Sequence, residues 1–195
     1  LVQFVSLWRG GEMVQMSSRS GQYVTLRDLR KEVGNDAARF YYVMRKSEQH
    51  IDFDLDLAVS QSKDNAVYYI QYAHARVNRM VNKAAEKNIP FNRNDLSHCD
   101  VTLLTLDAEA EILAKLAAYP EIVIRAANSY EPHQVGNYLK ELAALFHGWY
   151  NLDNLKILDD QNVSLSQSRL LLSINIQQVL KNGLTLLGVS APFEM

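Results

Sequence analysis

The sequence predicts a mainly α-helical protein in which a short N-terminal β-hairpin precedes an antiparallel bundle of helices. Three observations support this fold class. Residues 2–8 are rich in β-forming side chains and are followed by the turn signal Gly10-Gly11. From residue 25 onward, apolar side chains recur at the spacings of three and four that are typical of helices. The connections between these patterns are short, as in bundles of antiparallel helices.

The hairpin is expected within residues 1–24, because residues 12–16 return towards the first strand after the two glycines. A helix then begins after Thr25, whose side chain can cap it, with Asp28 three residues on as the capping-box partner. Gly34 is expected to end this helix, since glycine readily takes the left-handed conformation that follows many helices.

The next segments are a helix over residues 37–46 and a less regular stretch. Residues 51–57 alternate apolar and acidic side chains, as a strand does. We nevertheless favour an irregular segment that leads into a helix over residues 56–62. A domain boundary is expected near this point, between residues 1–62 and residues 63–195.

One long helix is predicted over residues 65–88, because five apolar side chains form a single stripe along it and Pro90 cannot continue it. The stripe consists of Ile70, Ala73, Val77, Met80 and Ala84. Residues 89–103 are expected to form a loop. Further helical patterns cover residues 107–118, 121–129, 132–151 and 166–187, and Gly188 ends the last of them.

Composition limits the function classes that fit. Hydrophobic residues make up 48% of the 195 residues, enough for a core, and no apolar run approaches the ~20 residues that span a membrane. The single cysteine, Cys99, excludes an internal disulfide and fits a reducing compartment. The net charge of −2 argues against a nucleic-acid binder when taken alone, but it does not exclude a local basic face. The chain starts at Leu1 without a signal peptide, and we expect it to be a fragment of a longer protein.

No complete active site is visible in the sequence. Asp52, Asp54 and Asp56 have the spacing of a calcium loop, but the positions that such a loop needs as Gly and Glu hold Leu57 and Lys63. Glycine-rich phosphate motifs with a lysine, nucleophile elbows and His-Glu-x-x-His motifs are absent. We therefore predict no metal site.

A candidate anion-binding loop follows the hairpin. Residues 15–21 combine small hydroxyl side chains, one cation and a glycine directly after a strand. The central residues of this loop are Met16, Ser17, Ser18 and Arg19. A plain polar connector between the hairpin and the helix is the alternative that this spacing leaves open.

A basic stripe runs along the long helix beside the apolar stripe. Its members are three or four residues apart and therefore share one face: Tyr72, Arg76, Arg79, Lys83 and Lys87. Such a stripe can follow a phosphate backbone while its tyrosine stacks on a base. A solvated basic face that Tyr72 anchors to the core is the alternative.

Three further side chains are candidates for a site. No carboxylate or nucleophile lies at a telling spacing from His74, so a partly buried structural histidine is expected there. Phe146, in an aromatic cluster, is expected in the core. Tyr150 lies four residues later, near the end of its helix, where it can reach a ligand.

Four motifs occur in order along the chain. They are the loop and following helix at residues 16–29, the segments 36–40 and 52–56, the helix Tyr-Tyr-Ile-Gln-Tyr-Ala-His-Ala-Arg at 68–76, and the tail at 186–195. Taken together they resemble arginyl-tRNA synthetases, which are class I aminoacyl-tRNA synthetases. The first motif resembles the KMSKS-type loop of that family, the second the segment that contacts the tRNA stem, and the last the C-terminal signature. The resemblance covers essentially the whole chain.

The resemblance implies a fold, an activity and partners. Residues 63–195 are implied to form the α-helical anticodon-binding domain of class I synthetases, and residues 1–62 the end of the catalytic domain with stem-contact helices. The full-length protein is implied to be a cytoplasmic enzyme that joins arginine to tRNA(Arg) with ATP and Mg²⁺. No HIGH motif is present, so this chain is expected to bind the anticodon stem-loop without catalysing alone. Neither a membrane nor DNA is expected as a partner. A helical protein-interaction or regulatory module on the same fold is the alternative.

The resemblance also assigns roles to single residues. Residues 16–19 match the loop that stabilises the pyrophosphate of ATP, although Gln15 and Ser18 stand where lysines are common. Arg19 is the cation that remains, so either Arg19 carries the charge or a lysine in the part of the enzyme outside this chain does. For tRNA binding, the resemblance implies Tyr72, Arg76, Tyr150 and the terminal Met195, and the basic stripe adds Arg79 and Lys83. Asn154 stands where some relatives have an aromatic.

Overall fold

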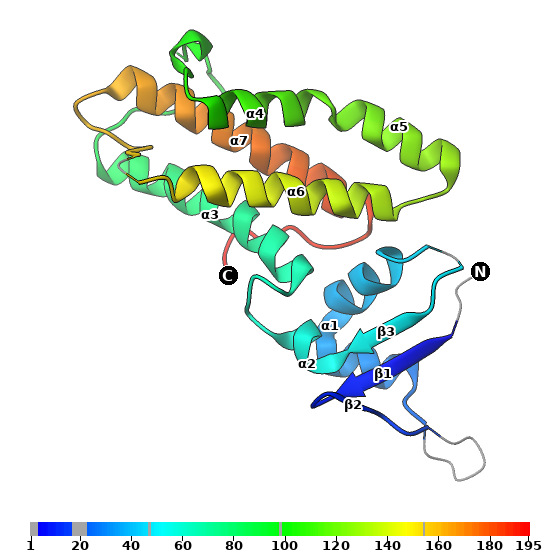
Figure 1. Ribbon diagram of the computed structural model, residues 1–195. Helices are drawn as coiled ribbons and strands as arrows, with labels where there is room; N and C mark the ends of the chain where they lie inside the picture. The colour runs from blue at the N-terminus through cyan, green and yellow to red at the C-terminus, as the bar shows by residue number, and fades with distance from the viewer. Residues whose placement is uncertain (1–3, 17–22, 47, 98, 154) are drawn as a thin grey trace.

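The computed structural model describes residues 4–16, 23–46, 48–97, 99–153 and 155–195. Figure 1 shows a small sheet with two helices formed by the N-terminal part of the chain, and a bundle of longer helices formed by the rest. The predicted fold class, mainly α with a short N-terminal β segment, is confirmed.

The sheet has three strands in the order β2-β1-β3. Val5–Arg9 (β1) and Glu12–Met13 (β2) form the predicted antiparallel hairpin. Ile51–Asp54 (β3) pairs in parallel with β1 on its other side. The hairpin is therefore part of a larger sheet than the sequence predicts.

The strand β3 shows that the irregular segment expected over residues 51–57 is wrong. Ile51 and Phe53 are buried, whereas Asp52 is exposed, so the alternation is that of a strand with one face in the core. A parallel strand needs a long crossover connection, and the helix between β1 and β3 supplies it. The partner strand, β1, lies far away in the sequence, so the local pattern of residues 51–57 did not distinguish a strand from an irregular segment.

Two helices pack against this sheet: Leu26–Val43 (α1) and Leu55–Val59 (α2). Thr25 caps α1, and the predicted capping box with Asp28 is present. Gly34, with φ 82° and ψ 161°, interrupts the helical backbone. The two helices that the sequence predicts here are therefore the two halves of one kinked element.

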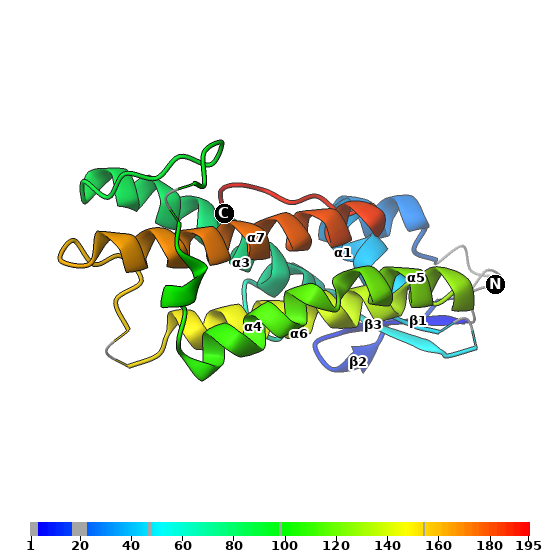
Figure 2. The same cartoon turned by 90° about the horizontal axis from the view of Figure 1, so that it is seen from above.

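Five helices form the bundle, and in Figure 2 α4 and α5 follow one another nearly end to end along α6. Their bounds are Ala66–Glu86 (α3), Asp107–Ala117 (α4), Tyr119–Ser129 (α5), His133–Tyr150 (α6) and Val163–Leu186 (α7), and a 3-10 turn lies at Val101–Leu103 (η1). The last helix starts earlier than predicted, because the side chain of Asn162 accepts a hydrogen bond from the N–H of Leu165 and so caps it.

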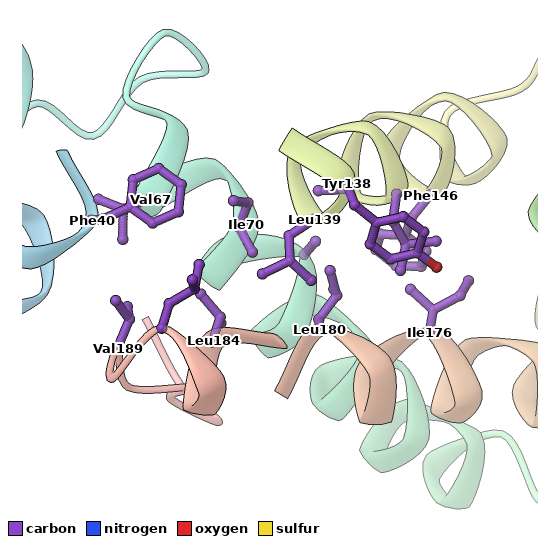
Figure 3. Packing of buried hydrophobic residues seen from close by; sticks show 14 of the residues in the cluster. Phe40, Val67, Ile70, Tyr138, Leu139, Phe146, Ile176, Leu180, Leu184 and Val189 are labelled. Atoms are coloured by element: carbon purple, nitrogen blue, oxygen red, sulfur yellow. The ribbon is translucent and has the colours of Figure 1, made fainter. Parts of the chain in front are cut away.

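Apolar side chains of α3, α6 and α7 meet in the centre of the bundle (Figure 3), among them Ile70, Leu139 and Leu180. Phe40 of α1 and Val189 after α7 belong to the same cluster (Figure 3). The apolar stripe predicted for the long helix is confirmed, since every member is buried: Ile70, Ala73, Val77, Met80 and Ala84. One continuous core therefore joins the bundle to the N-terminal unit.

The C-terminal tail, residues 188–195, leaves α7 at Gly188, as predicted. Gly188 has φ +69°, and the N–H of the next residue, Val189, donates to the Leu184 carbonyl at 2.9 Å. This is the backbone pattern of a glycine that ends a helix and turns the chain. The tail then returns along α3, so that the C-terminus lies beside that helix (Figure 1).

Candidate functional site

The outward face of α3 carries most of the side chains in the predicted binding set. Tyr72 is half-buried, whereas Arg79 and Lys83 are exposed. Tyr68, one turn before Tyr72, stacks on it with 6.0 Å between the ring centroids and 6° between the ring planes. Because the apolar stripe of α3 is in the core, the basic and aromatic stripe faces outward.

Arg76 is held between two aromatic rings from different helices. Its guanidinium carbon lies 4.5 Å from the centroid of Tyr72 on α3 and 4.5 Å from the centroid of Tyr150 at the end of α6. Its Nη2 also donates to the Tyr72 hydroxyl at 2.8 Å. Within the described ranges, no carboxylate forms an ion pair with Arg76. Its positive charge is therefore positioned but not neutralised.

A buried histidine completes this arrangement. His147 lies on α6, one turn before Tyr150, and is 5% exposed. Arg76 Nη1 lies 3.1 Å from its Nδ1, and the Tyr69 carbonyl oxygen lies 3.3 Å from its Nε2. A guanidinium can only donate, so Nδ1 accepts and Nε2 carries the proton. Burial first, and then the Arg76 charge, lowers the pKa of His147 to about 4, although the hydrogen bond to Tyr69 acts in the opposite direction. The ring is thus neutral at neutral pH.

Neither His147 nor Tyr68 is among the tRNA-binding residues that the sequence predicts. Each lies one helical turn before a predicted site residue, since Tyr68 precedes Tyr72 by four and His147 precedes Tyr150 by three. The spacing of three or four residues identifies them as candidates, because residues so spaced are neighbours on a helix surface. Phe146 is 0% exposed and packs in the core, as expected.

Met195 lies next to this cluster rather than in it. Its side chain is 44% exposed, and its carbonyl oxygen is 3.5 Å from Arg79 Nη2. With Tyr68 and Gln71 it lines an open groove of about 900 Å³ between α1 and α3. The structure therefore gathers two predicted residues, Tyr72 and Tyr150, around the guanidinium of a third, Arg76, and places the terminal methionine in the neighbouring groove.

The C-terminal tail is tied to both α1 and α3. Asp36 of α1 accepts hydrogen bonds from the N–H of Ser190, at 3.2 Å, and from its hydroxyl. Gln71 of α3 donates to Asp36 at 2.8 Å and to the Ser190 carbonyl at 3.0 Å. His74 is fully buried, as a structural role requires, and its Nδ1 donates to the Pro192 carbonyl at 2.7 Å. These contacts fix the end of the chain beside the aromatic face of α3.

The candidate anion-binding loop lies mostly outside the described residues. Met16 is described and is 43% exposed. Ser17, Ser18 and Arg19 are not among the described residues, and neither is Asn154. The role of this loop towards ATP therefore stays a prediction.

The described residues contain neither a cluster of metal ligands nor a membrane-spanning helix. No three His, Cys, Asp or Glu side chains gather within them to hold an ion. None of the helices in them combines the length and the apolar character that crossing a membrane requires. The acidic residues of β3 and α2 instead support the local backbone: Asp54 accepts from the Leu57 N–H at 2.9 Å, and Asp56 accepts from the Gly10 N–H at 2.6 Å.

The chain is similar in sequence to a known domain family and to full-length proteins. The DALR anticodon binding domain family matches residues 70–195. The whole chain is 77% identical to an arginine–tRNA ligase of Acinetobacter baumannii (strain AYE), of which it covers 32%. It is 60% identical, over 205 aligned positions, to an arginine–tRNA ligase of Psychrobacter sp. (strain PRwf-1), of which it covers 33%. The chain thus spans about a third of the length of the curated relatives it matches.

Solved structures show the same arrangement of elements. A Campylobacter jejuni protein described as an arginyl-tRNA synthetase superimposes with a TM-score of 0.84 at 28% identity, over 100% of this chain and 40% of that one. An arginyl-tRNA synthetase of Thermus thermophilus gives a TM-score of 0.67, also at 28% identity, over 91% of this chain and 29% of that one. The fold described above is therefore shared with proteins of this kind.

Proposed function

Because this chain belongs to the DALR anticodon binding domain family, we propose that it is the tRNA-binding part of an arginine–tRNA ligase. In this proposal the full-length protein joins arginine to tRNA(Arg), and this part recognises the anticodon stem-loop but does not catalyse alone. The names of the relatives at 77% and 60% identity support the activity. The 32% and 33% of those proteins that the chain covers support its role as one part of the enzyme.

The geometry of Arg76 is the observation that carries the binding role. A half-buried guanidinium that pairs with no carboxylate among the residues the structure describes is suited to a phosphate or a base edge. The rings of Tyr72 and Tyr150 provide stacking surfaces beside it, and unstacked RNA bases bind to such surfaces. Arg79 and Lys83 extend the positive charge along α3, and Met195 adds an apolar contact in the adjoining groove.

The similarity of this chain to arginine–tRNA ligases supports the remaining proposals. We assign residues 1–62 to the end of the catalytic domain and residues 63–195 to the anticodon-binding domain. Residues 16–19 contact the pyrophosphate side of ATP, and Arg19 supplies the positive charge there. We assign the arginine site, the Mg²⁺ ligands and the remainder of the ATP site to the part of the full-length protein that lies outside this chain. An enzyme of protein synthesis with these substrates works in the cytoplasm.

A filter-binding titration of the full-length protein with tRNA(Arg) and a non-cognate tRNA tests the proposal. The double substitution Tyr72→Ala, Arg76→Ala is expected to weaken tRNA(Arg) binding ~10- to 100-fold, because one stacking surface and one cation are lost. The slope of log Kd against log salt concentration is expected to decrease as well. Unchanged binding by this variant would overturn the site assignment.

A matched control removes the same two kinds of side chain from another surface. Tyr130 is 92% exposed at the end of α5, and Arg125 is exposed on the same helix. The double substitution Tyr130→Ala, Arg125→Ala is expected to leave the Kd within ~2-fold. A salt slope near zero for the unmodified protein would instead favour a protein-interaction module on the same fold.

A further inference from the structure

We propose that His147 is a positioning residue for tRNA binding, whose imidazole holds the Arg76 guanidinium in the orientation that meets the RNA. The inference rests on the proposed function and adds to it a residue that does not touch the tRNA. Its basis is the contact between His147 on α6 and Arg76 on α3, which are 71 residues apart in the sequence.

His147 itself is too deeply buried to contact an RNA ligand. It is 5% exposed, and aromatic rings enclose it. The centroid of its ring lies 4.5 Å from that of Tyr69, 5.6 Å from that of Tyr72 and 5.5 Å from that of Phe146. An effect of this residue on tRNA binding therefore has to pass through a half-buried neighbour, and Arg76 is the one whose side chain is hydrogen-bonded to the His147 imidazole.

The hydrogen bonds of His147 give the ring one orientation. The Nε2–H donates to the Tyr69 carbonyl, which leaves the Nδ1 lone pair towards Arg76 Nη1. Arg76 in turn donates one N–H to this nitrogen and one to the Tyr72 hydroxyl. A guanidinium has five N–H donors, so three remain for a ligand.

Two uncharged partners, the His147 imidazole and the Tyr72 phenol, suit an Arg76 guanidinium that binds a phosphate anion. A carboxylate in place of His147 would hold Arg76 more strongly but would cancel the charge that attracts phosphate. An imidazole and a phenol orient the guanidinium and leave its charge intact. Since the side chain is already held before binding, it loses less conformational entropy when the RNA arrives.

Two substitutions in the full-length protein separate positioning from simple packing. His147→Asn keeps an acceptor near the position of Nδ1 but leaves a cavity, whereas His147→Leu fills most of the volume without any acceptor. If His147 positions Arg76, His147→Leu weakens tRNA(Arg) binding by about 5- to 30-fold, and His147→Asn by less than ~3-fold. Thermal unfolding is expected to rank the two variants in the opposite order, because the cavity of His147→Asn lowers the Tm more.

A double-mutant cycle with Arg76→Ala completes the test. With Arg76 removed, His147→Leu is expected to have no further effect on the Kd for tRNA(Arg). An equal loss with and without Arg76, or a His147→Leu protein that binds like the unmodified one, would overturn the positioning role alone. If Arg76→Ala leaves binding unchanged, the proposed tRNA site is wrong, and the positioning role of His147 is then wrong as well. His147→Met replaces His147→Leu in the cycle should the latter not fold.

Discussion

Asp36 and Ser190 are hydrogen-bonded to one another although 154 residues separate them along the chain. Ser190 donates both its N–H and its hydroxyl to the carboxylate, and Gln71 of α3 donates to the same group. One side chain of α1 thus holds the C-terminal tail against the helix that carries the proposed tRNA-binding face.

Replacing Asp36 with Ala is expected to lower the free energy of unfolding by about 1–2 kcal/mol, because three donors lose their acceptor at a half-buried site. Amide hydrogen exchange in residues 189–195 is expected to become faster. Urea unfolding and exchange mass spectrometry measure the two effects. Glu111→Ala, an exposed carboxylate on α4, is the control and stays within about 0.5 kcal/mol. Unaltered exchange in the tail of the Asp36→Ala protein would contradict this role.

Glu109 and Arg169 form a buried ion pair inside the bundle, with 2.8 Å between Glu109 Oε1 and Arg169 Nε. Glu109 is 0% exposed and also accepts from Trp149 Nε1. Glu109→Gln leaves the guanidinium buried without its counter-charge, so the free energy of unfolding is expected to fall by about 3–5 kcal/mol. Chemical denaturation with Glu111→Gln as control checks this. A loss below about 1 kcal/mol would show that groups other than Glu109 compensate the buried charge of Arg169.

Glycine is required at position 188 but not at position 148. Gly188 has φ +69°, and a Cβ there would lie 2.3 Å from Arg39 Nε, whereas a Cβ on Gly148 of α6 would meet nothing within 4 Å. Gly188→Ala is therefore expected to destabilise the protein by about 1–3 kcal/mol. Gly148→Ala is expected to stabilise it by about 0.5–1 kcal/mol, because alanine favours a helix interior. Thermal unfolding of both variants measures the two signs, and equal shifts in Tm would refute the distinction.

His147 is expected to remain neutral in weak acid. Burial and the Arg76 charge lower its pKa to about 4, whereas an unperturbed histidine titrates near ~6.5, and Tyr69 and Tyr72 are the other titratable groups that face it. As the pH falls from ~6.5 to about 4, the unfolded chain takes up the proton first, so stability falls by up to about 1.4 kcal/mol per pH unit.

An NMR titration of the His147 imidazole is the direct measurement. It is preferable to a curve of stability against pH, because burial also lowers the pKa of His74. His74 therefore contributes its own loss of stability as the pH falls. His147→Asn should remove the share of the pH dependence that belongs to His147. A His147 resonance that titrates near pH 6.5 would contradict the buried hydrogen-bonded geometry.

The helices were largely predictable because their signals are local. The capping box of Thr25 and Asp28, the spacing of the buried stripe of α3 and the glycine at 188 each depend on residues three to five positions apart. The start of α7 was misplaced because a single side chain, Asn162, sets it. Of the proposed site, the outward stripe of α3 was predictable from the same periodicity.

By itself, the sequence determined the helical bundle, the end of its last helix and the basic face of α3, because periodicity and capping act between near neighbours. Only the tertiary structure decided that residues 51–54 form a strand, since their partner is β1. It also decided that Tyr150 and His147 of α6 enclose Arg76 of α3, and that the tail lies against Asp36. These contacts join residues 71 and 154 positions apart, and the packing of the common core, not any local pattern, brings them together.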